Sequence, residues 1–227
     1  LEKGRVVAIT GTNGKTTTTT LVGEIMKAHF ADVFVVGNIG NPYTLEVTKT
    51  NEASVTVAEI SSFQLETTDS FHPAVSAVLN ITPDHLNRHH TMENYVKAKE
   101  AIAAKQTGEE VCVLNYEDAW LRDFAKRCPA KVVYFSSGHR LEEGFYLEGD
   151  YIYRAKAGKS EKLLNVHDDM RLVGICNIEN VMAALAIAES MQVPMETVLR
   201  VIKEFKAVEH RIEYVAEKGG VVYYNDS

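Results

Sequence analysis

The sequence has little cysteine, no long apolar run and no excess of positive charge. Its 3 cysteines, Cys112, Cys128 and Cys176, are widely spaced and odd in number, which argues against a disulfide framework or a Cys-x-x-Cys zinc site and fits a reducing cytoplasm. No apolar run reaches the ~18 residues of a membrane-spanning helix, and no signal-like leader precedes the first apolar strand, so we expect a soluble protein that contacts no membrane. A net charge of −7 argues against a broad nucleic-acid-binding surface, so any anionic ligand must be held locally.

Alternating strand and helix patterns predict an α/β fold. Short apolar runs typical of buried strands alternate with segments of helical length, which implies parallel pairing through right-handed crossovers. The expected strands are 6–9, 33–36, 54–58, 74–79, 111–115 and 131–135. The expected helices run from the first loop to about residue 29, from 91 to 107 and from 118 to 127. We therefore predict a mostly parallel sheet with helices on both faces.

The pattern changes near residue 144. Alternation over 145–155 around Glu148-Gly149-Asp150 predicts a hairpin, and 162–166 a further antiparallel strand. Two helices, 177–191 and 194–205, and a strand pair, 212–216 and 221–224, complete the prediction. We interpret residues 1–227 as one domain with a small antiparallel annex, cut from a longer polypeptide.

The stretch Thr10-Gly11-Thr12-Asn13-Gly14-Lys15-Thr16-Thr17 joins the first strand to the first helix and predicts a P-loop-like nucleotide site. Glycines and free N–H groups at a helix N-terminus bind phosphate, Lys15 would contact the outer phosphates, and the Thr16 hydroxyl would ligate magnesium. The general P-loop spacing would require glycine where Ile9 stands. Five consecutive threonines, 16–20, are poor helix formers. Either the chemistry of the site requires them at the first turns of the helix, or they form a solvated run.

Polar residues follow the next three strands. Asn38 follows the second strand, Glu59 ends the third, and Asp84 and His85 come after the fourth. Ligands of such sheets bind beyond the carboxyl ends of the strands, so these side chains are expected beside Lys15. Glu59 would give an oxygen to magnesium and His85 an imidazole nitrogen, although a solvated glutamate and a structural histidine are the alternatives.

Lys99 lies within an apolar helical stripe. At helical spacing it shares a face with Met92, Tyr95, Val96 and other apolar residues, whereas Lys97 points away. One interpretation is an aliphatic stem that covers apolar surface with its ammonium in water. The other is a buried lysine whose pKa is lowered by desolvation, so that its neutral amine can react.

Two further segments carry a family resemblance. Glu59-Ile60-Ser61-Ser62-Phe63-Gln64-Leu65-Glu66 and the stretch from Asn80 to His89, together with the phosphate loop, resemble the Mur ligase family, and within it the members that add D-glutamate to UDP-N-acetylmuramoyl-L-alanine. The resemblance spans nearly the whole chain and corresponds to the central, ATP-binding domain, without the N-terminal UDP-binding and C-terminal domains.

The resemblance implies a role for each matching residue. ATP would contact Gly11, Thr12, Asn13, Gly14, Lys15, Thr16, Thr17, Asn177, Asn180, Arg211 and Asp226. The muramoyl-alanine substrate would contact Asn38, Ser61, Gln64 and His85. Two Mg²⁺ ions would be held by Thr16, Glu59, His85 and a carbamylated Lys99, and Lys15, Lys99, His85 and Arg211 would be catalytic. Cys176 departs from the family, where histidine is common.

The implied reaction is ATP-dependent amide formation through an acyl phosphate, in cytoplasmic peptidoglycan precursor synthesis. The substrates would be ATP, D-glutamate and UDP-N-acetylmuramoyl-L-alanine, and we expect a monomer. Another Mur ligase, a folylpolyglutamate-synthase-like ligase and a nucleotide-dependent switch are the alternatives. A switch would leave Asp84, His85, Lys99 and the Ser61–Gln64 segment without a role. We expect the isolated chain to be inactive, since two family domains are missing.

Overall fold

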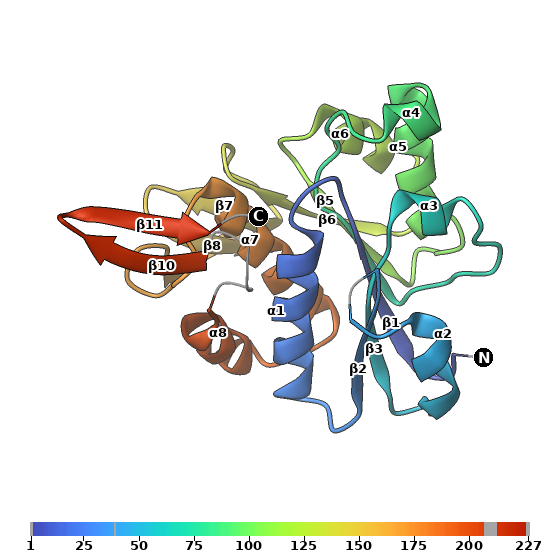
Figure 1. The fold of residues 1–227 in the computed structure, drawn as a ribbon, viewed down its shortest axis with the longest axis horizontal. Coiled ribbons are helices and arrows are strands. Elements are labelled where there is room, and N and C mark those ends of the chain that lie inside the picture. Colours follow the sequence, from blue (N-terminus) through green and yellow to red (C-terminus); the bar gives the residue numbers. More distant parts are fainter. Residues whose placement is uncertain (1, 39, 207–212, 226–227) are drawn as a thin grey trace.

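A nine-stranded sheet forms the centre of the protein (Figure 1). The computed structural model describes residues 2–38, 40–206 and 213–225. The strand order is β2-β3-β1-β4-β5-β6-β7-β8-β9, and a separate two-stranded sheet, β10-β11, completes the described part. The edges of the large sheet are therefore β2 and β9.

The first seven strands pair in parallel, as predicted for the first six. Their bounds are β1 Arg5–Thr10, β2 Val33–Gly37, β3 Val55–Glu59, β4 Val75–Val78, β5 Val111–Asn115, β6 Lys131–Ser136 and β7 Gly144–Glu148. Strand β1 lies between β3 and β4, because the chain passes first to one side of it and then to the other. The loop after β1 therefore has the ends of two strands beside it.

Helices cover both faces, since alternate residues of a strand point to opposite sides. Val7 and Ile9 of β1 pack into one apolar cluster with α1 (Lys15–Lys27), α7 (Ile175–Ser190) and α8 (Met195–Glu204). Val6 and Ala8 pack into the other with α5 (Met92–Glu100), η2 (Ala101–Ala103) and α6 (Ala119–Ala125). The predicted two-faced α/β architecture is confirmed.

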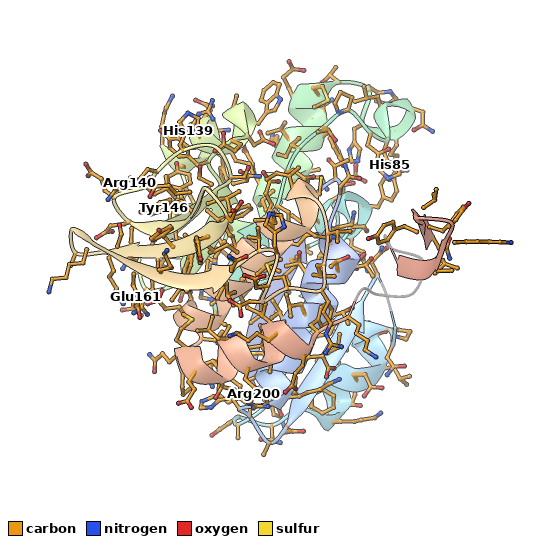
Figure 2. The ribbon with its side chains drawn as sticks, turned by 90° about the vertical axis from the view of Figure 1, so that its left-hand side faces the viewer. His85, His139, Arg140, Tyr146, Glu161 and Arg200 are labelled. Atoms are coloured by element: carbon orange, nitrogen blue, oxygen red, sulfur yellow. The ribbon has the colours of Figure 1, made fainter. Side chains whose placement is uncertain are left out.

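The predicted antiparallel hairpin is also confirmed, but it continues the main sheet. Strand β7 pairs in parallel with β6, and β8 (Tyr151–Lys156) and β9 (Lys159–Asn165) follow it antiparallel. Strands β10 (Glu213–Lys218) and β11 (Val221–Asn225) pair around Gly219-Gly220 as a sheet of their own. Figure 2 shows Tyr146 of β7 and Arg140 of the loop before it on the opposite side of the molecule from His85.

Several short helices were not predicted. They are η1 (Val47–Lys49), α3 (Ser62–Leu65) and α4 (Leu86–His89), whereas α2 (Tyr43–Glu46) follows Pro42, a residue that suits the first turn of a helix. Each spans about one turn, too short for hydrophobic periodicity to reveal. The helix expected over 91–107 ends at Glu100 and continues only as the 3-10 turn η2. Among the described helices, none is both long enough and apolar enough to cross a membrane.

Candidate functional site

The loop between β1 and α1 is held from the β4 side by Asn80. The Asn13 N–H donates to Asn80 Oδ1 at 2.8 Å, the Asn80 amide donates back to the Asn13 carbonyl at 3.1 Å, and the Thr12 N–H donates to the Asn80 carbonyl at 2.9 Å. Three bonds to one residue fix the loop to the strand next to β1. Asn80 was not among the predicted site residues, although it lies two residues after β4, where ligand-binding residues are expected.

Gly14 makes the turn into α1 possible. Its φ of +81° lies in the left-handed region, and a Cβ there would come within 2.2 Å of Asn180 Oδ1. The Asn180 amide in turn donates to Asn177 Oδ1 at 3.2 Å, and both asparagines are buried. Only glycine therefore allows α7 to pack this closely against the loop. The two asparagines predicted to face adenine lie beside the loop.

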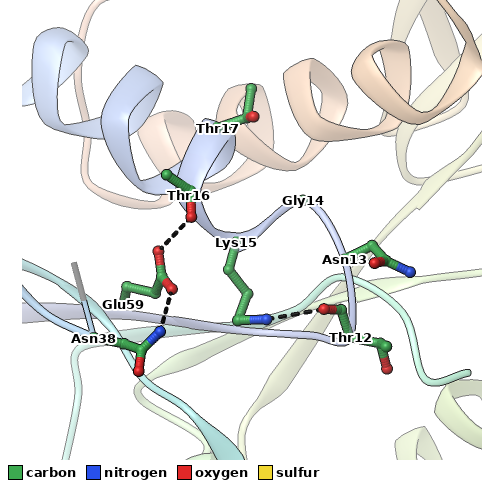
Figure 3. A pocket seen from close by; sticks show the side chains of 8 residues that line it. All are labelled: Thr12, Asn13, Gly14, Lys15, Thr16, Thr17, Asn38 and Glu59. Carbon is green, nitrogen blue, oxygen red and sulfur yellow. Dashed lines mark hydrogen bonds between the residues drawn. The ribbon is translucent and has the colours of Figure 1, made fainter. Parts of the chain in front are cut away.

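A pocket opens at the N-terminus of α1, and Figure 3 shows Glu59 between Thr16 and Asn38 in its lining. It is lined by Thr12, Asn13, Gly14, Lys15, Thr16, Thr17, Asn38 and Glu59. The Thr16 hydroxyl donates to Glu59 Oε2 at 3.1 Å, and the Asn38 amide donates to Glu59 Oε1 at 2.9 Å. The structure thus brings together three side chains that the sequence predicted to meet here.

The oxygen atoms at the base of the pocket suit magnesium. Glu59 is 1% exposed, and within the described residues no cationic side chain forms an ion pair with it. A buried carboxylate without a cation is costly, which a bound metal ion would relieve. The described residues hold no cluster of three or more His, Cys, Asp or Glu side chains. Magnesium, which commonly binds one or two carboxylates plus phosphate oxygens and water, fits Thr16 and Glu59 better than a metal that needs a protein cage.

The threonine run of α1 is not a solvated surface. Thr17, Thr18 and Thr19 are buried, and the Thr20 hydroxyl donates to the Thr16 carbonyl at 2.8 Å. The alternative of a solvated run is therefore wrong. Small β-branched side chains fit where the first turns of the helix pack closely on neighbouring elements.

Two lysines converge on one carbonyl oxygen of the loop. Lys15 Nζ donates to the carbonyls of Gly11 at 3.1 Å and Thr12 at 2.9 Å, and Lys99 Nζ donates to the same Gly11 carbonyl at 2.8 Å. Lys99 reaches it from α5, on the other face of the sheet. Two ammonium groups this close repel each other, which favours loss of a proton from the less solvated one.

Lys99 is that less solvated group. It is 2% exposed, and burial, assisted by the charge of Lys15 and opposed by Asp84, lowers the pKa of Lys99 to about 7. Tyr95 and Val96 are buried on the same face of α5, whereas Lys97 is exposed. The buried interpretation is confirmed, and the alternative with the ammonium in water is wrong.

Three of the remaining predicted site residues, His85, Ser61 and Gln64, are described by the structure. His85 Nε2 lies 3.4 Å from Asp84 Oδ2, and its ring contacts Phe63 with 4.9 Å between centroids. Ser61 and Gln64 form a capping box on α3, with the Ser61 N–H and hydroxyl both donating to Gln64 Oε1 at 2.9 Å. His85, Ser61 and Gln64 do not line the phosphate-loop pocket. Arg211 and Asp226 lie outside the described residues.

Comparison with known proteins gives consistent results. The family model described as Mur ligase middle domain matches residues 9–188. UDP-N-acetylmuramoylalanine–D-glutamate ligases from Lachnospira eligens and Clostridioides difficile are 58% and 52% identical to this chain, over 100% and 97% of its length. The chain spans about half the length of these relatives, 50% and 49%.

Solved structures share the fold at lower identity. MurF from Acinetobacter baumannii matches with a TM-score of 0.76 at 17% identity, covering 99% of this chain and 51% of that one. A UDP-N-acetylmuramoyl-L-alanyl-D-glutamate–2,6-diaminopimelate ligase matches with a TM-score of 0.75 at 22% identity, covering 96% and 50%. By its matched middle domain and by its identity to these relatives along the whole chain, this protein belongs to the Mur ligase family.

Proposed function

We propose that this chain is the nucleotide-binding domain of an ATP-dependent ligase that adds D-glutamate to UDP-N-acetylmuramoyl-L-alanine. A substrate carboxylate would attack the γ-phosphorus of ATP to give an acyl phosphate, and the amine of D-glutamate would then displace phosphate through a tetrahedral intermediate. The relatives named as D-glutamate ligases support this choice of substrates over those of other Mur ligases. The rest of a full-length ligase would supply the domains that this chain does not contain.

The observation that carries the proposal is the arrangement around the phosphate loop. Lys15 and the N-terminus of α1 offer positive charge, Thr16 and Glu59 offer hard oxygen atoms, and Lys99 enters from the opposite face of the sheet. Phosphoryl transfer needs mainly positioning and charge neutralisation, so no nucleophilic side chain is required.

Each group at the loop has a distinct task in this proposal. Lys15 would exchange its bonds to the loop carbonyls for the outer phosphates of ATP. Thr16 and Glu59 would hold magnesium, with Asn38 orienting the Glu59 carboxylate through their 2.9 Å bond. Bound magnesium would offset negative charge on the transferring phosphoryl group.

Lys99 would act as a carbamate. Its neutral amine would attack the carbon of CO₂, forming an N–C bond and releasing one amine proton to solvent. The product is an anionic, carboxylate-like group, which would hold a second magnesium ion together with His85. A pKa lowered to about 7 favours this chemistry, because only the unprotonated amine is a nucleophile.

The other assignments belong to the same proposal. Asn38, Ser61, Gln64 and His85 would contact the muramoyl-alanine substrate. Asn177 and Asn180 would face adenine, Arg211 the phosphates and Asp226 the ribose. We propose a cytoplasmic enzyme that acts as a monomer.

The test is substrate-dependent ATP turnover by a full-length ligase that carries this chain. ATP hydrolysis and incorporation of labelled amino acid are measured with UDP-N-acetylmuramoyl-L-alanine and with the longer muramoyl peptides as acceptors. D-glutamate incorporation into the first acceptor alone is the expected result. Turnover with another acceptor would identify a different ligase, and nucleotide hydrolysis without any acceptor would favour a switch.

The same assay applied to the isolated chain tests the need for further domains. We expect no D-glutamate incorporation, because correct positioning contributes up to ~7–11 kcal/mol of barrier lowering and much of it would come from elsewhere in the ligase. Clear product formation by the isolated chain would contradict this requirement.

A further inference from the structure

We propose that His89 is a positioning residue that holds the segment carrying Phe63 and His85 in register with the phosphate loop. The proposal rests on the proposed ligase function, because its consequence is measured on turnover. His89 is the last residue of α4 and lies outside the phosphate-loop pocket, so it would act through its neighbours.

Both ring nitrogens of the buried His89 have a partner. The residue is 4% exposed, Nε2 lies 3.0 Å from the Ser62 hydroxyl, and Nδ1 lies 3.2 Å from Glu66 Oε1. Burial lowers the pKa of His89, which favours the neutral ring, and the Arg88 guanidinium lowers the pKa of Glu66 and keeps it ionised, so the single ring proton is assigned to Nδ1, which donates to Glu66. Nε2 is then the acceptor of the Ser62 hydroxyl. The ring orientation is fixed by a donor at one edge and an acceptor at the other.

These bonds connect two helices that are too short to be stable on their own. Helices α3 and α4 have 4 residues each, far below the ~12 needed for independent stability. His89 connects the end of α4 to Ser62 at the start of α3 and to Glu66 at its end. His89 therefore makes two of the contacts that fix the relative placement of the two helices, beside the bond from Arg88 Nη2 to Glu66 Oε2 at 2.9 Å.

The faces of the same ring connect the two sides of the site. Phe63 stacks on His89 with centroids 5.5 Å apart and planes 10° apart, and Tyr95 packs against His89 at 5.1 Å. Phe63 also contacts the His85 ring at 4.9 Å. Movement of His89 would therefore displace the ring that supports His85.

Tyr95 carries the connection into the phosphate loop. Its hydroxyl lies 3.1 Å from Thr12 Oγ1, which also accepts the Thr82 N–H at 3.0 Å, and the Lys99 ammonium lies 4.7 Å from the Tyr95 ring centroid. A continuous series of contacts thus leads from Ser62 through the His89 and Tyr95 rings to Thr12 and Lys99. His89 stands at the middle of this line.

The predicted consequence is a loss of alignment with nucleotide binding retained. Gly14, Thr16 and Glu59 are held by contacts that do not include His89, so the affinity for ATP should survive its removal. Misplacement of reacting groups by about 1 Å costs up to roughly 100-fold in rate. The effect should therefore appear in kcat, with KM for ATP little changed.

The experiment uses His89→Ala, His89→Gln and Ser62→Ala in a full-length ligase that carries this chain. Glutamine can donate to Glu66 and accept from Ser62, and Ser62→Ala removes one tether while leaving the ring in place. The matched control is His72→Gln, since exposed His72 pairs with Glu110 at 3.2 Å, at the end of the sheet away from the loop. kcat, KM for ATP and the melting temperature are measured for each protein.

We expect kcat to fall about 10- to 100-fold in His89→Ala, with partial recovery in His89→Gln, a smaller fall in Ser62→Ala and KM for ATP within about threefold of wild type. The control should match wild type. A kcat within twofold of wild type in His89→Ala and Ser62→Ala would overturn the proposal. The proposal would also be overturned if kcat fell only in proportion to the folded fraction, with no recovery in His89→Gln relative to His89→Ala. The proposed function is tested separately, by finding which acceptor the wild-type ligase uses. The variants are then compared with wild type on that acceptor.

Discussion

The two helical layers that cover the sheet differ in what they bury. Under α1, α7 and α8 the buried polar side chains of the helices, Thr17–Thr19, Asn177 and Asn180, carry no charge, and residues 181–188 of α7 are all buried and apolar. The opposite layer buries Lys99, His89 and Gln106 among its apolar side chains. Gln106 is satisfied locally by bonds to Ser76, Pro73 and Val111, whereas Lys99 and His89 connect to the phosphate loop or its neighbours.

This difference indicates that one layer mainly stabilises the fold and the other mainly serves the reaction. Apolar burial stabilises a fold at about 25 cal/mol per Å², whereas a buried ionisable group costs free energy unless its charge is removed or paired. Groups whose pKa is shifted by burial are typical of functional sites. The α7 layer should therefore dominate folding stability, and the α5 layer should dominate turnover.

Lys99→Ala tests the functional layer and should have the largest effect. Loss of the carbamate that we propose for Lys99 should lower kcat of a full-length ligase roughly 10³-fold, as for removal of one strong electrostatic contact. Lys97→Ala, two residues away on the exposed side of α5, is the control and should be active. Wild-type turnover in Lys99→Ala would remove this residue from the proposed mechanism.

Leu185→Ala tests the apolar layer. Leu185 is fully buried in α7, so its truncation should lower the free energy of unfolding by about 2–5 kcal/mol through lost burial and a cavity. Urea denaturation measures this, and kcat of the folded fraction should be unchanged. A specific loss of kcat would contradict the separation of the two layers.

Lys15→Ala tests the side of the loop that faces ATP. Loss of a charged phosphate contact should weaken ATP binding by about 1.5–3 kcal/mol, while the melting temperature stays near that of wild type. Calorimetric titration of the chain with Mg-ATP measures the affinity. Unchanged affinity would show that the loop does not hold the nucleotide as proposed.

The pH dependence of stability tests the buried amine. Unfolded Lys99 keeps its proton up to the ordinary value of 10.5, and folded Lys99 releases it near 7. Between these values the unfolded state binds more protons, so stability rises with pH, and below pH 7 the full cost of charging the buried amine remains.

From pH 7.5 to pH 9 the gain should be about 2 kcal/mol for wild type relative to Lys99→Met. Urea denaturation in CO₂-free buffer, which prevents carbamate formation, measures it. Parallel pH profiles for the two proteins would mean that Lys99 titrates at its ordinary value.

Sequence patterns predicted the elements whose burial is periodic. Every strand expected in the parallel sheet is present, because alternating or continuous apolar runs reflect burial directly, and the face of α5 that carries Lys99 was identified in the same way. The pairing of β7 with β6 was not predicted, because nothing in the local sequence of β7 indicates which strand lies on its other side.

Contacts across the fold account for what was missed at the site. Asn80 binds the loop because β4 happens to neighbour β1, and His89 meets Ser62, 27 positions earlier, through two one-turn helices. Neither pairing leaves a spacing pattern in the chain. The phosphate loop was predictable because its chemistry is local, with glycine, lysine and threonine adjacent in sequence.

The two edge strands of the large sheet differ in how readily a second molecule could pair with them. Strand β9 carries exposed Lys159, Glu161 and Lys162, and charges on an edge strand oppose pairing with a second molecule. Strand β2 reads Val-Phe-Val-Val-Gly, without a charge, and its end is closed by a bond from the Gly37 N–H to the Asn41 carbonyl at 3.1 Å. The bond at Asn41 therefore does more than lead the chain to α2: it shortens the uncharged edge of the large sheet, where pairing with a second molecule would be least opposed.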